Sequence, residues 1–363
     1  MRVAIIGGGA CGLLLANLLE EAKVSYELFE KSLIGRKILA SGNGKANIGN
    51  IHLEPNQYNQ PLGYELVSKY KDKLNAFWKR CGLYTKQDEE GRIYPLSESS
   101  LSVLQCLLRK NLHIVENYPI TRITRMNQKF YLNEVRGPFD YVVLATGSIA
   151  SFLPKKQQGF YDFLNGLDVQ MTPLIPSLVG FKLVGNLKRL QGVRIKCNAK
   201  LIQKNTILYQ ESGEVIFKND GISGICVLNL SSYYGRFKDK RDCRISLDLL
   251  PGMEVEVESH EALTGLLHPK LCDYLKDIPI QQINSLLHDF SFPIAGLYDF
   301  EFAQVASGGI ALEEINDDFS LKKNPHIYVG GELLDIDGVC GGYNLMFAFC
   351  SALKIGEELC NIK

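Results

Sequence analysis

The opening thirty residues carry the hydrophobic pattern of a strand, a helix and a second strand. Residues 2–6 form an apolar run, residues 11–21 place leucines near helical spacing, and residues 25–29 alternate polar and apolar positions. This order predicts a β-α-β unit, which is the building block of a parallel, doubly wound sheet.

The next hundred residues continue both the helical and the strand-like hydrophobic patterns. Helical periodicity marks residues 64–81 and 101–108, and a strand is predicted at 112–116. A short buried strand within residues 139–148 ends in Ala-Thr-Gly, a combination typical of the turn that returns a chain to the cofactor edge of such a sheet.

Between about residues 151 and 305 this alternation stops. Strand-like pieces bounded by Gly, Asn and Ser take its place, namely 178–183, 193–201, 206–209, 214–217, 225–230 and 244–248. Helical segments near 261–275 and 280–287 follow them. We therefore predict the first part of an α/β, Rossmann-type domain (1–150), an inserted β-rich and helical region suited to cover a substrate (151–305), and the C-terminal part of the first domain (306–363).

The first apolar strand runs into GGGACG, where Gly7, Gly9 and Gly12 have the spacing of a dinucleotide-binding fingerprint. Glycine has no Cβ, so backbone amides at such a turn can approach a pyrophosphate. Glu30 ends the second strand 18 residues after Gly12, where a carboxylate can accept hydrogen bonds from both hydroxyls of an adenosine ribose. The predicted contacts around this turn also include Ala10, Cys11 and Lys31.

The segment GRKILASGNGKANIGN (residues 35–50) is rich in Gly and Asn and poor in large apolar residues, so it predicts a loop rather than a core element. Clustered Gly and Asn can present concave arrays of backbone amides to anionic or carbonyl oxygens. Arg36, Lys37 and Lys45 add positive charge suited to phosphates. We therefore expect this segment to contact a cofactor.

A second glycine turn lies near the C-terminus. A strand ends at Gly330-Gly331, an acidic loop follows, and Gly341-Gly342 precede an apolar helix that begins near Tyr343. That helix would direct unpaired N–H groups and the positive end of its dipole at an isoalloxazine ring, which becomes anionic around N1 and O2 when reduced. NAD would leave this motif unexplained, whereas FAD uses both ends. FAD is therefore the predicted cofactor.

Composition and charge narrow the class of protein. The 363 residues include 40 basic and 40 acidic ones, and this zero net charge gives no footprint for nucleic acid or an anionic membrane. No apolar stretch approaches the roughly 20 residues of a membrane span, and the fingerprint starts too early for a signal peptide, so we expect a cytoplasmic protein.

Ten cysteines without a C-x-x-C pair predict reduced thiols, and Cys11 is interpreted as a small residue at a helix start. The six histidines show no metal-ligand spacing, so no metal site is predicted.

Three motifs resemble those of a known family. GRKILASGNGKANIGN is similar to its GRKILxSGGGRCNxTN signature, GEVIFKNDGISGICVLNLS to GExLFTHxGxSGPxxLxxS, and GGELLDIDGVCGGYNLMFAF to GExLDxDGxxGGYNLQxAx. These motifs are typical of bacterial FAD-dependent oxidoreductases of the aminoacetone oxidase-like (YhiN/BaiN-like) group, which also includes reductases proposed for bile-acid dehydroxylation. The resemblance spans nearly the whole chain.

The resemblance implies a Rossmann-type FAD domain that is interrupted by a β-rich domain and a small helical domain. It also implies FAD contacts at Gly7, Gly9, Gly12, Glu30, Arg36, Lys37, Ser41, Gly42, Asn47, Thr146, Gly147, Gly331, Glu332, Asp337, Gly341, Gly342, Tyr343, Asn344 and Leu345. The chain departs from the pattern at Lys45-Ala46, which replace Arg-Cys, and at Lys218-Asn219, which replace Thr-His. The inserted region is also shorter than the family pattern implies.

These features predict an FAD-dependent oxidoreductase that moves a hydride between flavin N5 and a small or steroid-like organic substrate. A C=C reductase that NAD(P)H visits transiently and an amine or aminoketone oxidase that uses oxygen both fit the sequence, since no second GxGxxG follows to hold a nicotinamide stably. A non-enzymatic flavin-binding protein or an RNA-modifying flavoprotein is the alternative from another class. Candidates for proton transfer are Tyr343, Asp335, Asp337, Cys340 and Tyr94, and the sequence does not choose among them.

Overall fold

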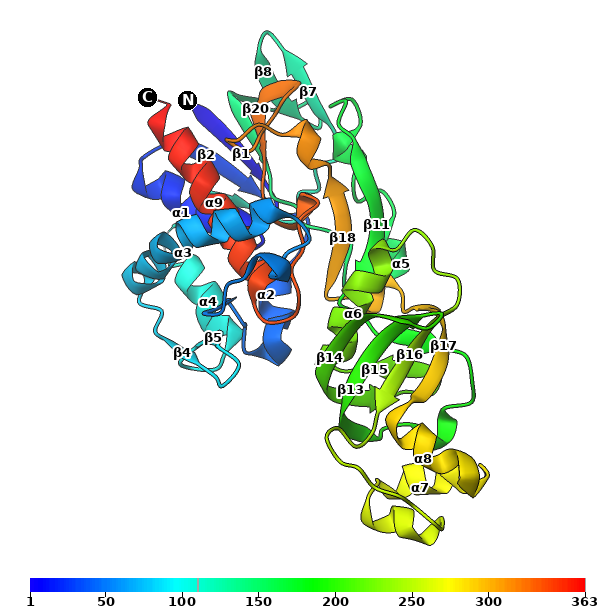
Figure 1. The fold of residues 1–363 in the computed structure, drawn as a ribbon. Coiled ribbons are helices and arrows are strands. Elements are labelled where there is room, and N and C mark those ends of the chain that lie inside the picture. The colour runs from blue at the N-terminus through cyan, green and yellow to red at the C-terminus, as the bar shows by residue number, and fades with distance from the viewer. Residues whose placement is uncertain (110, 363) are drawn as a thin grey trace. The chain divides into compact units, whose positions relative to one another are not determined.

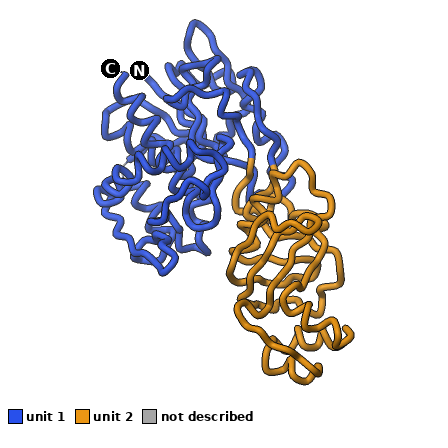
Figure 2. Tube along the Cα trace, in the orientation of Figure 1, with its two compact units in different colours: residues 1–174, 308–363 blue, residues 175–307 orange. Residues whose placement is uncertain are grey.

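The computed structural model describes residues 1–109 and 111–362 and divides the chain into two compact units (Figure 2). Unit 1 comprises residues 1–174 and 308–363, and unit 2 comprises residues 175–307. The chain leaves unit 1 through strand β11 (Met171–Ser177) and returns through β18 (Val305–Ile310), and these strands pair with each other. Residues 151–174, which the hydrophobic pattern assigns to the insertion, belong to unit 1.

A six-stranded sheet with the order β19-β20-β10-β1-β2-β6 forms the centre of unit 1. Its strands run parallel except β19, which is antiparallel at one edge. Val3, Ala4 and Ile5 are fully buried, which explains why the first strand is continuously apolar rather than alternating. The strands are β1 (Arg2–Ile6), β2 (Ser25–Phe29), β6 (Ile114–Val115), β10 (Tyr141–Leu144), β19 (Ser320–Leu321) and β20 (Asn324–Val329). The predicted Rossmann-type architecture is confirmed.

Helices α1 (Ala10–Glu21) and α9 (Tyr343–Asn361) lie side by side, and α3 (Pro61–Cys81) packs against α9 (Figure 1). Gly356 allows this close packing, because a Cβ there would lie 2.6 Å from Leu18 Cδ1. Two further helices, α2 (Arg36–Ala40) and α4 (Ser100–Leu107), contact each other, and α5 (Pro154–Gln157) is a single turn. Among the described residues, no helix has the length and apolarity needed to cross a membrane.

Two three-stranded antiparallel sheets complete unit 1, and the hydrophobic pattern predicted neither. Their strands have only two to four residues, too few to show a period. One sheet has the order β3-β5-β4, with β3 (Gly49–Asn50), β4 (Thr85–Gln87) and β5 (Arg92–Pro95). The other has the order β7-β8-β9, with β7 (Ile123–Met126), β8 (Lys129–Leu132) and β9 (Arg136–Phe139).

The prediction that residues 35–50 form a loop without core residues was wrong. The segment contains α2, a 3-10 turn at Ser41–Gly44 and strand β3. Ile38 and Ala46 are fully buried, and Ile48 is nearly so. The few apolar side chains of this segment therefore anchor it in the core, while its glycines and polar residues shape the surface.

Unit 2 is built on a closed barrel with the strand order β12-β15-β14-β13-β16-β17 and has a hydrophobic core of its own. The predicted pieces 206–209 and 214–217 are one long strand. The barrel strands are β12 (Phe181–Leu183), β13 (Arg194–Gln203), β14 (Thr206–Phe217), β15 (Gly221–Ser223), β16 (Cys243–Asp248) and β17 (Phe290–Leu297). Two short helices, α7 (Pro269–Leu275) and α8 (Ile280–His288), correspond to the predicted helical segments.

The strand predicted at residues 225–230 was wrong, because this segment begins helix α6 (Ile225–Arg236). Val227, Leu230 and Tyr234 are buried at helical spacing, and α6 packs on β14. A short apolar run such as ICVLNL does not distinguish a buried strand from a buried helix by periodicity alone.

Candidate cofactor site

The first glycine turn joins β1 to α1 and is packed tightly on one side and open on the other. Gly7 has a φ of 113°, and a Cβ there would collide with the carbonyl group of Ala145 at the end of β10. A Cβ at Gly12 would collide with the Gly7 carbonyl oxygen. At Gly9, by contrast, a Cβ would meet no atom of the described residues within 4 Å. The turn therefore exposes backbone to a ligand at Gly9, as a pyrophosphate site requires.

Glu30 directly follows β2, and its carboxylate is fixed beside this turn. Its Oε2 accepts a hydrogen bond from the Gly8 backbone N–H at 2.8 Å, and its Oε1 accepts one from the Ser32 N–H at 2.9 Å. An ionised carboxylate has about four acceptor positions, so the group keeps capacity for ribose hydroxyls. The structure thus places the predicted ribose ligand at the fingerprint turn.

Two predicted contacts, Lys37 and Glu332, meet a residue from a third distant segment. Its Nζ forms an ion pair with Glu332 Oε2 at 2.7 Å and donates to Ser148 Oγ at 3.1 Å. Ser148 Oγ in turn donates to Glu332 Oε1 at 2.6 Å. Glu332 therefore balances the charge of Lys37, and the network ties α2 to the turns after β10 and β20. Sequence reasoning missed Ser148, although its position directly after Ala-Thr-Gly was a usable signal.

Positive charge gathers near Glu30, the predicted ribose ligand. Arg36 donates to the Ser151 carbonyl oxygen at 3.2 Å, and its Cζ lies 3.7 Å from the centroid of the Phe152 ring. Its Nη2 is buried without a hydrogen-bond partner among the described residues. Burial lowers the pKa of the Lys31 ammonium, and the cationic side chains nearby lower it further against the opposing effect of Glu30. An anionic ligand would provide a partner for the unpaired guanidinium nitrogen of Arg36 and would offset the repulsion between Lys31 and the neighbouring cations.

The 35–50 segment meets the start of α9 at Gly342. This residue has a φ of 98°, and a Cβ there would collide with Asn47 Oδ1 and lie 2.8 Å from the carbonyl carbon of Gly49. The glycine is therefore required by the protein's own backbone at Gly49, in addition to any need of a flavin. No side chain caps α9 at this position, and Asn47 Oδ1 is buried without a partner among the described residues.

The loop before α9 uses its polar side chains to hold itself together. Asp335 accepts hydrogen bonds from Thr172 Oγ1 at 2.8 Å and from the Gly308 N–H at 3.1 Å. Asn344 bonds the backbone N–H and carbonyl of Gly338 at 2.9 and 2.8 Å. Asp337 is 2% exposed. These side chains position the loop, and contact with the cofactor through them stays a prediction.

The Tyr343 side chain is also engaged. Its hydroxyl donates to the His52 carbonyl oxygen at 2.9 Å, and the Tyr58 hydroxyl donates to the Tyr343 carbonyl oxygen at 3.0 Å. Burial raises the pKa of Tyr343 to about 12. These contacts fix the first turn of α9 against the segment that follows β3.

Cys11 lies behind the glycine turn, facing the end of β20 and α9. It is 3% exposed, its Sγ lies 3.6 Å from Ser351 Oγ, and a Cβ at Gly330 would lie 2.6 Å from that sulfur. Burial raises the pKa of the thiol to about 12. These contacts agree with the interpretation of Cys11 as a small packing residue.

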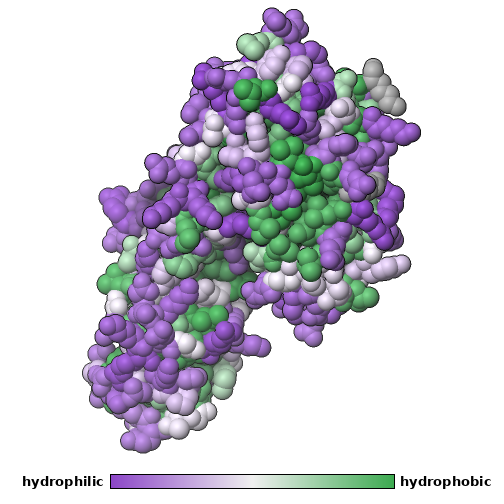
Figure 3. All heavy atoms as spheres, turned by 180° about the vertical axis from the view of Figure 1, so that it is seen from behind, coloured by the Kyte–Doolittle hydropathy of each residue, from purple (hydrophilic) through white to green (hydrophobic). Residues whose placement is uncertain are grey.

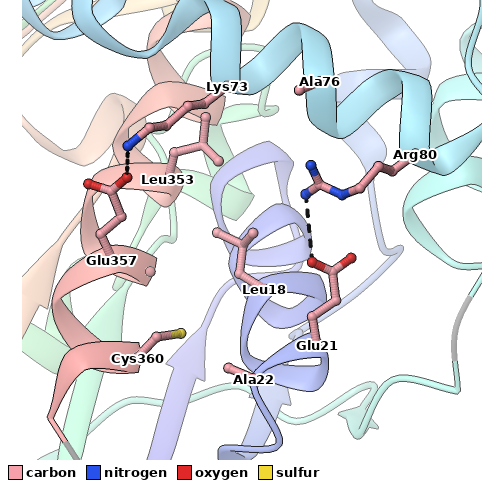
Figure 4. A pocket seen from close by; sticks show the side chains of 10 residues that line it. Leu18, Glu21, Ala22, Lys73, Ala76, Arg80, Leu353, Glu357 and Cys360 are labelled. Atoms are coloured by element: carbon pink, nitrogen blue, oxygen red, sulfur yellow. Dashed lines mark hydrogen bonds and ion pairs between the residues drawn. The ribbon is translucent and has the colours of Figure 1, made fainter.

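A groove of about 450 Å³ between α1, α3 and α9 lies away from this site (Figure 4). Leu18 and Leu353 line it, and the ion pairs Lys73–Glu357 and Arg80–Glu21 flank it. Leu18 follows Gly9 by about 14 Å along the helix axis. The groove is thus separate from the glycine turn.

Hydrophobic residues gather in one area of unit 1 when it is seen from behind (Figure 3). Leu33 and Leu153, which neighbour the cationic cluster in sequence, are 58% and 61% exposed. A contiguous exposed apolar area is typical of surfaces that bind ligands or partners.

The residues present fit FAD. The open turn at Gly9 and Arg36 Nη2 suit a pyrophosphate, Glu30 suits the ribose, and the uncapped start of α9 with Asn47 Oδ1 suits the polar edge of an isoalloxazine ring. Two of these features, Arg36 Nη2 and Asn47 Oδ1, are buried polar atoms without a partner in the described part of the chain, a situation that proteins otherwise avoid.

The fold and this site define the chain as an FAD-dependent oxidoreductase, as the sequence predicted. The family described as the HI0933-like protein Rossmann domain matches residues 1–358, and the chain belongs to this family. The expected kinship with YhiN/BaiN-like flavoproteins is thereby confirmed.

Two curated relatives match almost the full chain. The chain is 28% identical over 403 residues to the 3-dehydro-bile acid delta(4,6)-reductase of Clostridium scindens, with 98% of each protein covered. It is 24% identical over 400 residues to the ribosomal RNA dihydrouridine synthase of Escherichia coli, with 98% of this chain and 97% of the relative covered. The open conformation of a flavocytochrome c3 fumarate reductase has the same fold, with a TM-score of 0.51, 14% identity, and 99% of this chain and 78% of that chain covered.

Proposed function

We propose that the protein reduces a C=C bond conjugated to a carbonyl group of a small organic molecule, with NAD(P)H as a transient reductant. The observation that carries the proposal is the chemistry shared by the names of two nearly full-length relatives. A 3-dehydro-Δ4,6 bile acid has its double bonds conjugated to the C3 carbonyl, and uridine has a C5=C6 bond conjugated to the C4 carbonyl. Both named reactions reduce a C=C bond that is conjugated to a carbonyl, which requires a hydride at the electron-poor carbon of that bond and a proton at its other carbon.

The residues of this chain would serve that reaction by holding and polarising the cofactor. FAD, when bound, supplies the two-electron carrier that takes up and releases a hydride. Glu30 would hold the ribose, and the turn at Gly9 would hold the pyrophosphate. The first N–H groups of α9 would stabilise negative charge at the polar edge of the flavin, and Asn47 Oδ1 would accept a hydrogen bond from a ring N–H.

The net charge of the chain supports the proposed class of substrate. With 40 basic and 40 acidic residues the chain has no net positive charge, which favours a small molecule over a polyanion. Reduction of uridine in ribosomal RNA is the second candidate, and it is favoured by the relatives of that name, which match at 24% identity.

An anaerobic experiment separates these possibilities from an oxidase. Protein-bound FAD is mixed with NADPH or NADH, and the loss of flavin absorbance is followed. Rapid bleaching supports the reductase. Bleaching by an amine or aminoketone but not by nicotinamide, with reoxidation by oxygen, would support the oxidase instead. A 3-dehydro-Δ4,6 bile acid and an unmodified ribosomal RNA fragment are then offered to the reduced protein, and the one that restores absorbance identifies the substrate class.

A further inference from the structure

Tyr94 lies beside the turn that adjoins the start of α9. It belongs to β5, whose neighbour β3 pairs Gly49 with Ile93 and Asn50 with Arg92. A Cβ at Gly42 would lie 3.5 Å from Tyr94 Cε1 and 2.8 Å from the backbone nitrogen of Asn47. The Tyr94 ring therefore packs against the same turn whose other end, through Asn47, meets Gly342.

The Tyr94 hydroxyl is available for chemistry. The side chain is half-buried, and no residue in the described part of the chain forms a hydrogen bond with its hydroxyl. Burial raises the pKa of the phenol, so it stays protonated at neutral pH. The charged groups that face it are Arg92 and Lys45, which oppose this rise, and Asp88 and Glu90, which add to it. Lys45 is held nearby by an ion pair of 2.9 Å with Glu98.

The other candidates for proton transfer all have contacts of their own, namely Tyr343, Asp335, Asp337 and Cys340. The Tyr343 hydroxyl donates to the His52 carbonyl, and Asp335 accepts hydrogen bonds that fix the chain at Thr172 and Gly308. Asp337 is buried. The cysteine of the family signature is absent, because residue 46 is a fully buried alanine. Of the candidates that carry a titratable proton near the 41–50 segment, Tyr94 combines proximity, partial exposure and an unengaged hydroxyl.

We propose that Tyr94 is the catalytic residue that donates the proton in this reduction, an inference that rests on the proposed function. The hydride supplied by the reduced cofactor forms a C–H bond at the β carbon of the substrate, and the π electron pair of the C=C bond moves to the α carbon. The Tyr94 O–H bond breaks as its proton forms a C–H bond at the α carbon. The phenolate then takes a proton from water, and NAD(P)H returns two electrons to the oxidised cofactor.

The test compares Tyr94→Phe with Tyr84→Phe, which removes the hydroxyl of a nearby tyrosine that is 76% exposed. Each FAD-loaded protein is reduced with NADPH without oxygen and then mixed with a 3-dehydro-Δ4,6 bile acid. We expect Tyr94→Phe to bleach as the parent does but to reoxidise about 10²- to 10⁴-fold more slowly, which is the usual contribution of a general acid. The solvent deuterium isotope effect of the parent should change in this variant alone. Equal reoxidation rates would overturn the assignment.

A second measurement needs no substrate. Tyrosine ionisation is followed by ultraviolet absorbance between pH 8 and 12, without FAD and with FAD. Covering Tyr94 with the cofactor should raise the pKa of one tyrosine in the parent and in Tyr84→Phe, and this change should be absent from Tyr94→Phe. If FAD shifts no tyrosine, Tyr94 is remote from the cofactor and the assignment fails, even when the protein reduces the bile acid. If the shift occurs but no C=C bond restores flavin absorbance, the proposed function fails and the donor role falls with it.

Discussion

Replacing Glu30 by alanine should weaken FAD binding through the adenosine end alone. The carboxylate accepts the Gly8 and Ser32 N–H groups at 2.8 and 2.9 Å and has acceptor positions left for the ribose. Hydrogen bonds to a charged group contribute about 1.5–3 kcal/mol each, and water compensates part of the loss in a variant. A net loss of about 2–3 kcal/mol for the ribose pair corresponds to a roughly 30- to 150-fold higher dissociation constant.

The assay is a fluorescence titration of the cofactor-free protein with FAD, FMN and ADP. We expect Glu30→Ala to weaken FAD and ADP in parallel and to leave FMN unchanged, because FMN has no adenosine ribose. Ser32→Ala is the matched control, since it removes only a hydroxyl that contacts the same carboxylate at 3.3 Å. Unchanged FAD affinity in Glu30→Ala, or an equal loss for FMN, would refute the placement of the ribose at Glu30.

Three further outcomes follow from the packing and the charges. Residue 342 has a φ of 98° and a Cβ there would clash at Gly49, so Gly342→Ala should lower the free energy of unfolding, measured in urea, by about 2–4 kcal/mol. A Cβ at Gly44 meets no described atom within 4 Å, so Gly44→Ala should lower it by only about 1–2 kcal/mol. Equal losses in the two variants would contradict the clash. Glu27, in β2, forms ion pairs with Arg2 and Arg136. Burial acts to raise the pKa of Glu27, but hydrogen bonds from these two arginines outweigh it and lower that pKa. The stability lost in Glu27→Gln, about 1–2 kcal/mol at pH 7, should therefore vanish as the pH falls through the lowered pKa of the folded parent, and a pH-independent difference between the two proteins would show that the carboxylate charge is not responsible. Cys11, whose pKa burial raises to about 12, should resist alkylation at pH 8 until the protein unfolds, as mass spectrometry of labelled peptides would show, and its labelling in the native protein would place it at the surface.

The local sequence was sufficient to predict features that depend only on neighbouring residues, such as a glycine turn or the start of a helix. The glycine spacing after an apolar strand, followed by Glu30, predicted the turn and the carboxylate that the structure places together. The apolar helix after Gly341-Gly342 was predicted for the same reason, and α9 does begin at Tyr343.

Features that depend on contacts between distant segments could not be predicted in this way. The network of Lys37, Ser148 and Glu332 joins residues that are up to 295 positions apart. The sheet that brings Tyr94 to the Gly42 turn is made of strands too short to show a period. At α6, tertiary packing rather than periodicity decides between strand and helix.

The central claim is that this flavoprotein delivers a hydride and a proton to a C=C bond conjugated to a carbonyl. The most direct measurement reduces protein-bound FAD with light under argon, adds one equivalent of a 3-dehydro-Δ4,6 bile acid, and records flavin absorbance together with the mass of the steroid. The proposal predicts that absorbance returns without oxygen and that the steroid gains two hydrogen atoms. A flavin that stays reduced with this compound and with unmodified ribosomal RNA, and that reoxidises only when oxygen is admitted, would contradict it.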